Sequence, residues 1–192
     1  NPKACEPSWP GTPLFANGLP ERADDADEVL NVIWRLDDLV VVSSRCCVYG
    51  FRKGGTVASV NLRQDRINFD IRGWSVVPLQ DKFRIIIAYV EVGNTGGLMF
   101  LDFDPDASTL ELAHDLPLNV PVKDVSTHDG RLAAVAEDGE VFSGAATATT
   151  VELLYRFPSG ELVDIDLRKV LLLNEDRVLL AARGIVYEGR CP

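Results

Sequence analysis

Two segments near the C-terminal end of the chain read almost alike: Gly139-Glu-Val-Phe-Ser-Gly144 and Gly184-Ile-Val-Tyr-Glu-Gly189. Each places an apolar residue and an aromatic residue between two glycines. Five short stretches of the chain end in nearly the same pattern, an apolar–aromatic pair: Leu14-Phe15, Val48-Tyr49, Met99-Phe100, Val141-Phe142 and Val186-Tyr187. Counted from their first members, the last four pairs are 51, 42 and 45 residues apart. A period of about 40–50 residues indicates a repeated structural unit.

The residues around each pair have the pattern of short strands joined by tight turns. Residues 32–62 contain four short apolar runs, and turn signals separate them at Asp37-Asp38 and at Gly54-Gly55. Repeated antiparallel sheets of this size are the blades of a β-propeller. We therefore predict an all-β chain that forms a propeller or partial propeller of about four antiparallel blades. A β-sandwich or barrel is the alternative, because these folds also contain many short strands.

The repeat makes predictions about single residues. Four side chains are expected in the core: Leu132, Val141, Phe142 and Val186. Gly139 and Gly184 are expected in turns, and Asn94-Thr-Gly-Gly97 reads as a further turn. Residues 162–173 are expected as strand, because Val163, Ile165 and Leu167 alternate with polar residues.

The first 28 residues differ from the rest of the chain. They contain five prolines and the acidic cluster Asp24, Asp25, Asp27 and Glu28. We divide the chain into a Pro-rich acidic N-terminal arm, residues 1–28, and a propeller-like β domain, residues 29–192. Prolines leave few donors for a sheet ladder, yet the arm carries the apolar pair Leu14-Phe15. We expect this pair to dock near Val186-Tyr187.

The composition limits the classes of partner. The chain has 192 residues, 46% of them hydrophobic, and a formal net charge of −10. Nucleic-acid binders cluster Lys and Arg, so this charge disfavours a nucleic acid or an anionic membrane as the partner. The longest apolar runs, such as residues 85–90, have the length of a strand and fall short of the roughly 18 residues of a membrane span. A protein partner fits best, and whether a small molecule binds stays open.

The four cysteines, Cys5, Cys46, Cys47 and Cys191, are too few for a disulfide framework in a chain of this length. We therefore expect an intracellular protein, cytoplasmic or nuclear. A secreted protein is the alternative, with a disulfide between Cys5 and Cys191, which lie near the two termini.

Catalytic and metal-binding patterns are weak. Asp102, Asp104 and Asp106 have the spacing that opens a calcium loop, but Ala107 stands where that loop needs glycine. A polar turn is the preferred interpretation. His114 and His128 have no Cys or His at zinc-ligand spacing. We expect no catalytic residue, no metal and no cofactor.

One stretch resembles a known repeat. It combines the segments Val122-Lys-Asp-Val125, Leu132-Ala-Ala-Val135, Glu137-Asp-Gly139 and Val141-Phe142. In this order and spacing they resemble one repeat of the regulator of chromosome condensation family, which implies a propeller. The chain departs from that repeat at His128, Arg131 and Gly144, which stand where the family has Gly, His and Trp.

A second family is a close rival. The segment Gly97-Leu-Met-Phe-Leu-Asp102 resembles the closing strand of a WD repeat, with Leu101-Asp102 in the place of Trp-Asp. The Asp-Gly-x-Val segment at residues 138–141 occurs in both families, so it does not separate them. Neither resemblance transfers an activity to this chain.

These observations favour a non-catalytic scaffold that binds a protein partner within a larger assembly. The partner would cover an open strand edge or complete the propeller. The expected contact residues are Trp9, Phe15, Arg52 and Lys53, since Trp is common at interface hot spots and residues 52–55 form a basic hairpin turn. Two alternatives stay open. One is a propeller-pocket hydrolase using Asp102, Asp104 and Asp138, and the other is a secreted ligand-binding β-domain.

Overall fold

The computed structural model describes residues 31–36, 39–43, 47–52, 55–62, 70–93, 95–147, 150–156, 167–174, 177–182 and 185–190. Within these ranges all regular secondary structure is β-strand. None of the described segments forms a helix that is long and apolar enough to cross a membrane.

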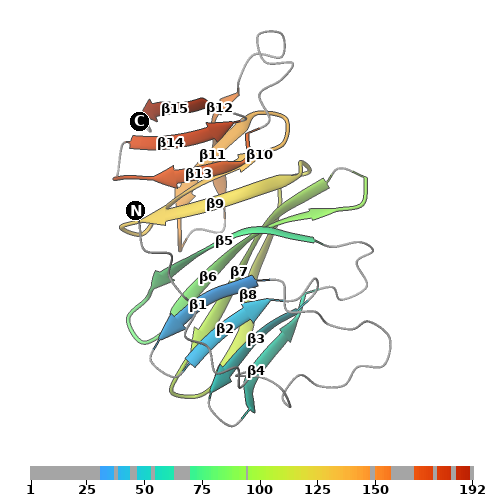
Figure 1. Cartoon of the computed structure of the whole chain (residues 1–192), viewed down its shortest axis with the longest axis vertical. Helices are drawn as coiled ribbons and strands as arrows, with labels where there is room; N and C mark the ends of the chain where they lie inside the picture. Colours follow the sequence, from blue (N-terminus) through green and yellow to red (C-terminus); the bar gives the residue numbers. More distant parts are fainter. Residues whose placement is uncertain are drawn as a thin grey trace, which may run out of the picture.

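The strands form four antiparallel sheets in chain order (Figure 1). The first holds β1 (Asn31–Leu36), β2 (Leu39–Ser43), β3 (Cys47–Arg52) and β4 (Gly55–Asn61). The second holds β5 (Asp70–Pro78), β6 (Phe83–Glu91), β7 (Thr95–Asp104) and β8 (Thr109–Pro117). The third holds β9 (Val122–His128), β10 (Arg131–Ala136), β11 (Glu140–Ala145) and β12 (Val151–Arg156). The fourth holds β13 (Lys169–Leu172), β14 (Arg177–Ala182) and β15 (Ile185–Arg190).

Each sheet is a meander in which every strand pairs with the next strand along the chain. The four downstream apolar–aromatic pairs all lie in the third strand of a sheet, in β3, β7, β11 and β15. The repeat in the sequence is therefore confirmed as one sheet per repeat. Four successive antiparallel sheets of this kind are the blades of a β-propeller, and the predicted fold class is confirmed.

The hydrophobic core is divided into layers between neighbouring sheets. One cluster joins the first and second sheets, a second joins the second and third, and a third joins the third and fourth. Strand β6 shows why the sequence does this. Its central residues 85–89 are all buried, and Ile85, Ile87 and Tyr89 face the first sheet while Ile86 and Ala88 face the third. Such a strand is apolar on both faces because both faces are covered.

The first strands of the sheets lie on a common side. Strand β5 contacts β1 and β9, and β9 also contacts β13, so the first strands of neighbouring sheets adjoin each other. The sheets follow one another along the long axis of the molecule, and Figure 1 places the first and fourth at opposite ends. The described strands thus form an arc of four blades.

The third-strand pairs do not all have the same orientation. In β11, Val141 packs between the third and fourth sheets and Phe142 faces the second sheet. In β7 the order is reversed, since Met99 faces the preceding sheet and Phe100 the following one. Side chains alternate between faces along a strand. The pair in β7 is therefore shifted by an odd number of residues from its structural equivalent, and the uneven spacing of 51 and 42 residues reflects this shift.

Most of the predicted core residues are confirmed. Leu132, Val141 and Phe142 are 1%, 1% and 7% exposed, and Gly139 lies in the β10–β11 turn with φ +84°. The prediction for Val186 is wrong, because its side chain is 66% exposed. It stands on the face of the fourth sheet opposite to the third core cluster.

Two further expectations need correction or lie outside the described ranges. The segment at residues 96–97 is not a turn, because Gly96 and Gly97 lie in β7 and pair with Val90 and Tyr89. Within residues 162–173, strand is confirmed for 169–172. Gly184, Leu14-Phe15 and the whole 1–28 arm fall outside the described residues.

Truncation of Phe142 tests the core between the second and third sheets. Because this side chain is buried, Phe142→Ala is expected to reduce the free energy of unfolding by about 3–5 kcal/mol, measured by urea denaturation. The matched control is Val186→Ala, which removes an exposed side chain from the third strand of the fourth sheet and is expected to change stability by less than about 0.5 kcal/mol. A loss below about 1 kcal/mol in Phe142→Ala would contradict the packing described here.

Candidate functional site: a basic pocket on the inner strands

Strand β9 joins the third sheet to the fourth through two polar side chains. Asp124 accepts a hydrogen bond from the backbone N–H of Val170 at 3.0 Å, and the hydroxyl of Ser126 accepts one from the N–H of Leu172, also at 3.0 Å. Val170 and Leu172 belong to β13, the edge strand of its sheet. The outward N–H groups of this edge are thus satisfied by side chains of the neighbouring blade, as buried backbone donors require.

Asp124 is a buried carboxylate that holds a backbone N–H and an ammonium group at the same time. Its side chain is 8% exposed and bonds the ammonium of Lys169 at 3.0 Å, in addition to Val170. Burial raises the pKa of the Asp124 carboxyl above its ordinary value of 3.8, and the bonds from Val170 and Lys169 oppose this rise only in part. Ionised Asp124 therefore depends on its two donors.

Strand β5 lies against the other side of β9. A Cβ atom on Gly73 would lie 2.3 Å from Oδ1 and 2.8 Å from Cα of Asp124, so only glycine fits here. Further along, the hydroxyls of Ser75 and Thr127 hydrogen-bond at 2.6 Å. Strands β5, β9 and β13 thus form one continuous seam, which we call the inner seam.

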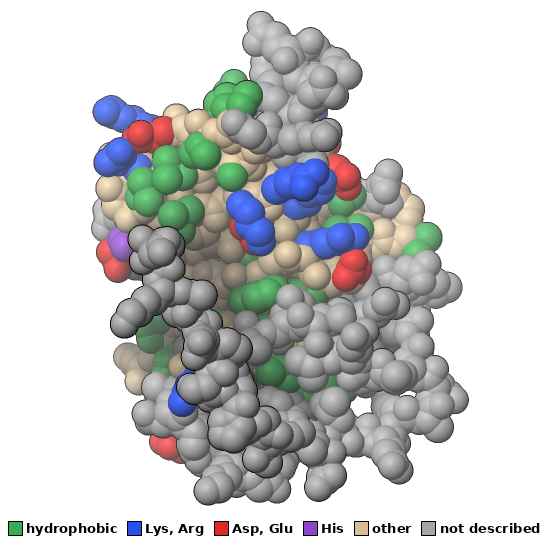
Figure 2. All heavy atoms as spheres, viewed as in Figure 1, with side chains coloured by type: hydrophobic (Ala, Val, Ile, Leu, Met, Phe, Trp, Pro, Cys, Tyr) green, Lys and Arg blue, Asp and Glu red, His purple; other side chains and the backbone are tan. Residues whose placement is uncertain are grey.

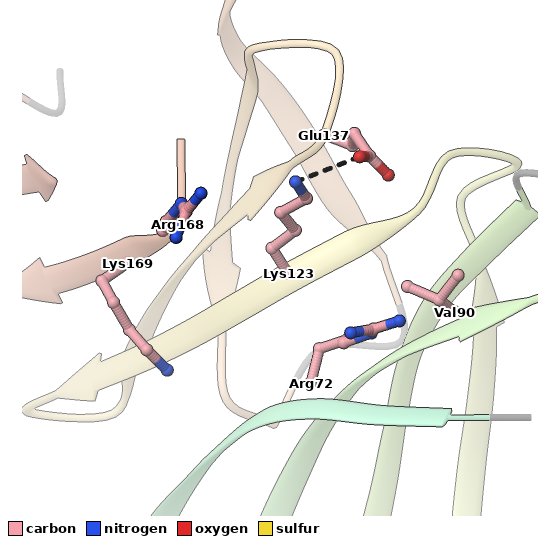
Figure 3. A pocket seen from close by; sticks show the side chains of 6 residues that line it. All are labelled: Arg72, Val90, Lys123, Glu137, Arg168 and Lys169. Carbon is pink, nitrogen blue, oxygen red and sulfur yellow. Dashed lines mark ion pairs between the residues drawn. The ribbon is translucent and has the colours of Figure 1, made fainter. Parts of the chain in front are cut away.

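A pocket of about 320 Å³ lies over the inner seam. Its lining comprises Arg72, Val90, Lys123, Glu137, Arg168 and Lys169 (Figure 3). Four of these six side chains are cationic and one is anionic, although the chain as a whole carries −10. Figure 2 shows Lys and Arg side chains gathered on this part of the visible face.

The cations of the pocket already contact carboxylates. Lys123 bonds Glu137 at 3.1 Å, and Arg72 bonds Asp70 at 2.8 Å on the surface. The Arg72 and Asp70 side chains are 52% and 42% exposed, so their pairing stabilises the fold little. Lys169 also contacts Asp124 at 3.0 Å, so the four cations and the three carboxylates that contact them leave a formal charge of +1, which an anionic group can use. Among the described residues, no cluster of three His, Cys, Asp or Glu side chains is placed to hold a metal ion.

The carboxylates considered for hydrolysis each have a local structural contact. Asp102 forms a two-point contact with Arg84, whose Nε and Nη2 lie 2.7 and 2.9 Å from its oxygens. Asp104 accepts the N–H groups of Asp106 and Ala107, which confirms the polar turn after β7. Asp138 accepts the N–H of Glu140 at 3.2 Å.

Of the four expected partner-binding residues, only the backbone of Arg52 lies in the part of the chain that the structure describes. Trp9, Phe15 and Lys53 lie outside the described residues. Arg52 is the last residue of β3 and pairs with Gly55, as the expected hairpin requires, but the structure does not describe its side chain. The histidines lie apart from the pocket lining, with the ring of His114 6.1 Å from that of Phe100 and His128 3.2 Å from Asp129.

Sequence reasoning missed the basic pocket. A signal was present, because Arg72, Lys123 and Arg168 are 51 and 45 residues apart, close to the 42 and 45 residues that separate the apolar–aromatic pairs of the same three sheets. Arg72 is the third residue of β5, Lys123 is the second residue of β9, and Arg168 directly precedes β13. Cations near the start of the first strand in successive blades are brought to one place, because these first strands adjoin.

No protein-family model matches the chain, and no curated protein matches it. Among solved structures, the computationally designed Ika4 protein is similar at a TM-score of 0.58 and 8% identity, over 95% of this chain and 99% of that one. KlAtg21, solved in complex with the coiled-coil of AgAtg16, is similar at 0.53 and 11% identity, over 85% of this chain and 53% of its own. The WD40 domain of SCAP from fission yeast scores 0.49 at 14% identity, over 79% and 39%.

These likenesses concern the fold alone, since all three identities are low. The chain spans about half the length of the KlAtg21 chain and less than half of the SCAP domain. It spans nearly the whole of the designed protein. A propeller is confirmed, and neither the chromosome-condensation type nor the WD type is singled out.

The raised pKa of Asp124 predicts a pH dependence of stability. Because the folded state binds this proton more tightly than the unfolded state, the stabilisation from protonation is present below the unfolded value near 3.8 and is lost as the pH rises through the folded value. Asp124→Asn cannot titrate. Its free energy of unfolding, measured relative to the wild-type chain by urea denaturation, is therefore expected to improve as the pH rises above about 4. A difference that is constant with pH, or that falls, would contradict this account.

The close approach at the inner seam gives a second prediction. Gly73→Ala places a methyl group against the backbone of Asp124, which cannot move aside, and is expected to cost about 1–3 kcal/mol of stability. The control is Gly189→Ala, whose methyl group would meet only Val178 Cγ1 at 3.3 Å. Thermal unfolding of the two variants compares them. Equal melting temperatures would mean that β5 and β9 are not held as described.

Proposed function

We propose that this chain is a non-catalytic protein-interaction scaffold, and that the outer face of its fourth sheet binds a protein partner within a larger assembly. The observation that carries the proposal is the exposure of Leu171 and Val186, which are 53% and 66% exposed. In each of the other three sheets, the face toward the next sheet carries a packed core layer, although Tyr155 on the outer strand β12 is 51% exposed.

The register of the fourth sheet defines this face. Leu171 pairs with Leu179, and Ala181 pairs with Val186. Residues that pair across antiparallel strands share a face, and Leu171, Leu179 and Ala181 alternate along their strands with the buried Val170, Leu172, Val178 and Leu180. We call the apolar surface of Leu171, Leu179, Ala181 and Val186 the terminal face.

The terminal face suits a partner of defined character. Contiguous exposed apolar side chains on one sheet are typical of a protein-binding surface. Arg177, Arg190 and Glu188 also lie on it, since Arg177 pairs with Arg190 and Glu188 with Leu179, and Arg177 forms an ion pair with Glu188. Lys169 shares this face, because it pairs with Ala181. With three cations to one carboxylate, a second copy of the same face would bring like charges together. We therefore infer a different protein, with an apolar surface flanked by carboxylates.

Two general observations support an interaction module. KlAtg21, which shares the fold, is a protein solved with a coiled-coil partner. The described carboxylates that were candidates for hydrolysis have local structural contacts, which favours a scaffold over an enzyme. We keep an intracellular setting, cytoplasmic or nuclear, as part of the proposal. The assignment to the chromosome-condensation or WD family also stays a prediction.

Site-specific photo-crosslinking tests the partner. A photoreactive residue at position 186, in cells that naturally contain the protein, is expected to give one discrete adduct with another protein. Leu171→Asp is expected to reduce this adduct at least about tenfold, because a desolvated carboxylate opposes docking. The control is Leu153→Asp on β12, since Leu153 is similarly exposed at 49% but lies outside the terminal face.

The outcomes are distinguishable. Loss of the adduct in Leu171→Asp and its retention in Leu153→Asp would support the terminal face as the binding surface. Equal adducts in both variants would contradict it. An adduct between two copies of this chain, formed by the purified protein alone, would contradict a different protein as the partner and would indicate self-association through the terminal face. Circular dichroism of each variant confirms that the sheets are intact.

A further inference from the structure

We propose that the basic pocket over the inner seam binds a small anion that carries more than one phosphate group. The pocket and the terminal face adjoin at Lys169, which lines the pocket and pairs with Ala181, but the two proposals concern different ligands and are tested with different variants. It rests on the pocket of about 320 Å³ and on the four cations that line it.

The pocket is assembled from three sheets. Figure 3 shows Lys123 on the central strand β9, with Arg168 and Lys169 on one side of it and Arg72 on the other. Arg72 is in β5, Lys169 begins β13 and Arg168 directly precedes it. The interstrand bonds of the inner seam, from Asp124 to Val170 and from Ser126 to Leu172, fix β13 relative to β9. The strands that carry or adjoin these cations are therefore held together by the seam.

The charge of the pocket favours a multivalent ligand. Glu137 contacts Lys123, Asp124 contacts Lys169, and Asp70 contacts Arg72 at the surface. A monovalent carboxylate would only repeat these contacts. A phosphate group carries close to two negative charges at neutral pH and three acceptor oxygens, so it can contact a paired lysine and an arginine at once.

The residue types favour phosphate over other anions. The two arginines offer planar forks that bind phosphate oxygens in pairs, and the two lysines act as point charges beside them. Val90 supplies the apolar part of the lining. The volume is at the lower end of the range of about 300–1,000 Å³ for small-molecule sites. It exceeds what a single phosphate ion needs, so the pocket has room for a second phosphate group.

Isothermal titration calorimetry with inorganic tripolyphosphate tests the site. Arg72→Gln and Arg168→Gln are each expected to weaken binding by at least about fivefold, since each removes charge-assisted hydrogen bonds to phosphate. The matched control is Arg177→Gln on β14, which removes an arginine outside the pocket lining and should leave the affinity within about twofold. Melting temperatures of all three variants report on the fold.

A gain of affinity provides the sharper test. Glu137→Gln removes the carboxylate that competes for Lys123 and is expected to tighten tripolyphosphate binding by about threefold or more. A residue with a merely structural role would not strengthen binding when replaced. Citrate, titrated at the same ionic strength, separates phosphate from carboxylate chemistry and is expected to bind at least about tenfold more weakly.

Three results would overturn the proposal. They are a heat from tripolyphosphate no larger than that from sulfate at equal ionic strength, a loss of affinity in Arg177→Gln as large as in Arg72→Gln, and citrate binding as tight as tripolyphosphate binding. None of them bears on crosslinking at position 186, so the two proposals fail separately. A structure with bound tripolyphosphate, showing contacts from Lys123 and both arginines, would complete the support.

Discussion

The arrangement of the third and fourth blades depends on two side chains, Asp124 and Ser126, that accept backbone hydrogen bonds where a neighbouring strand would otherwise accept them. Strand β13 is an edge strand, and its N–H groups at Val170 and Leu172 point toward a neighbouring sheet that offers no backbone partner in register. Asp124 and Ser126, two residues apart on β9, supply the acceptors at the spacing that a strand edge demands. Backbone donors that are buried must be paired, so this bridge determines where the fourth sheet can lie.

The same bridge carries a cost that the surroundings offset. A carboxylate with 8% exposure is poorly solvated, and the raised pKa of Asp124 records that penalty. Lys169 sits beside it at the start of β13 and supplies the compensating charge. Gly73 on β5 leaves the room that Asp124 needs. Gly73 of the second sheet, Asp124 of the third and Lys169 of the fourth thus form one unit, and the basic pocket lies over it.

The sequence predicts the strands well because the relevant signals are local. Apolar runs, glycine turns and the recurring pairs such as Val141-Phe142 depend on neighbours a few residues away, and they fall in the third strand of every sheet. The face of the sheet to which each side chain points is harder to predict from the sequence. Met99 and Phe100 match the motif in composition but point to the opposite faces from their counterparts in β11. A shift of one residue moves every side chain of a strand to the other face, and the apolar sequence looks the same either way. The pocket was missed for a related reason, since its cations are a full blade apart along the chain.

The two ends of the arc differ in a way that local signals do not encode. On the first sheet, the side chains that face away from the second sheet are Val42, Cys47 and Tyr49, and all three are buried. On the fourth sheet, the corresponding outward residues Leu171 and Val186 are open. The motif Val186-Tyr187 is the same as in the buried blades, so its sequence is suited to an interface between sheets. Tyr187 packs toward the third core cluster, while Val186 has the residue type for a core on a face that is exposed here. Val186 is an apolar side chain of the type that packs between sheets, yet it is exposed. This is the physical reason to look for the partner at this end of the arc.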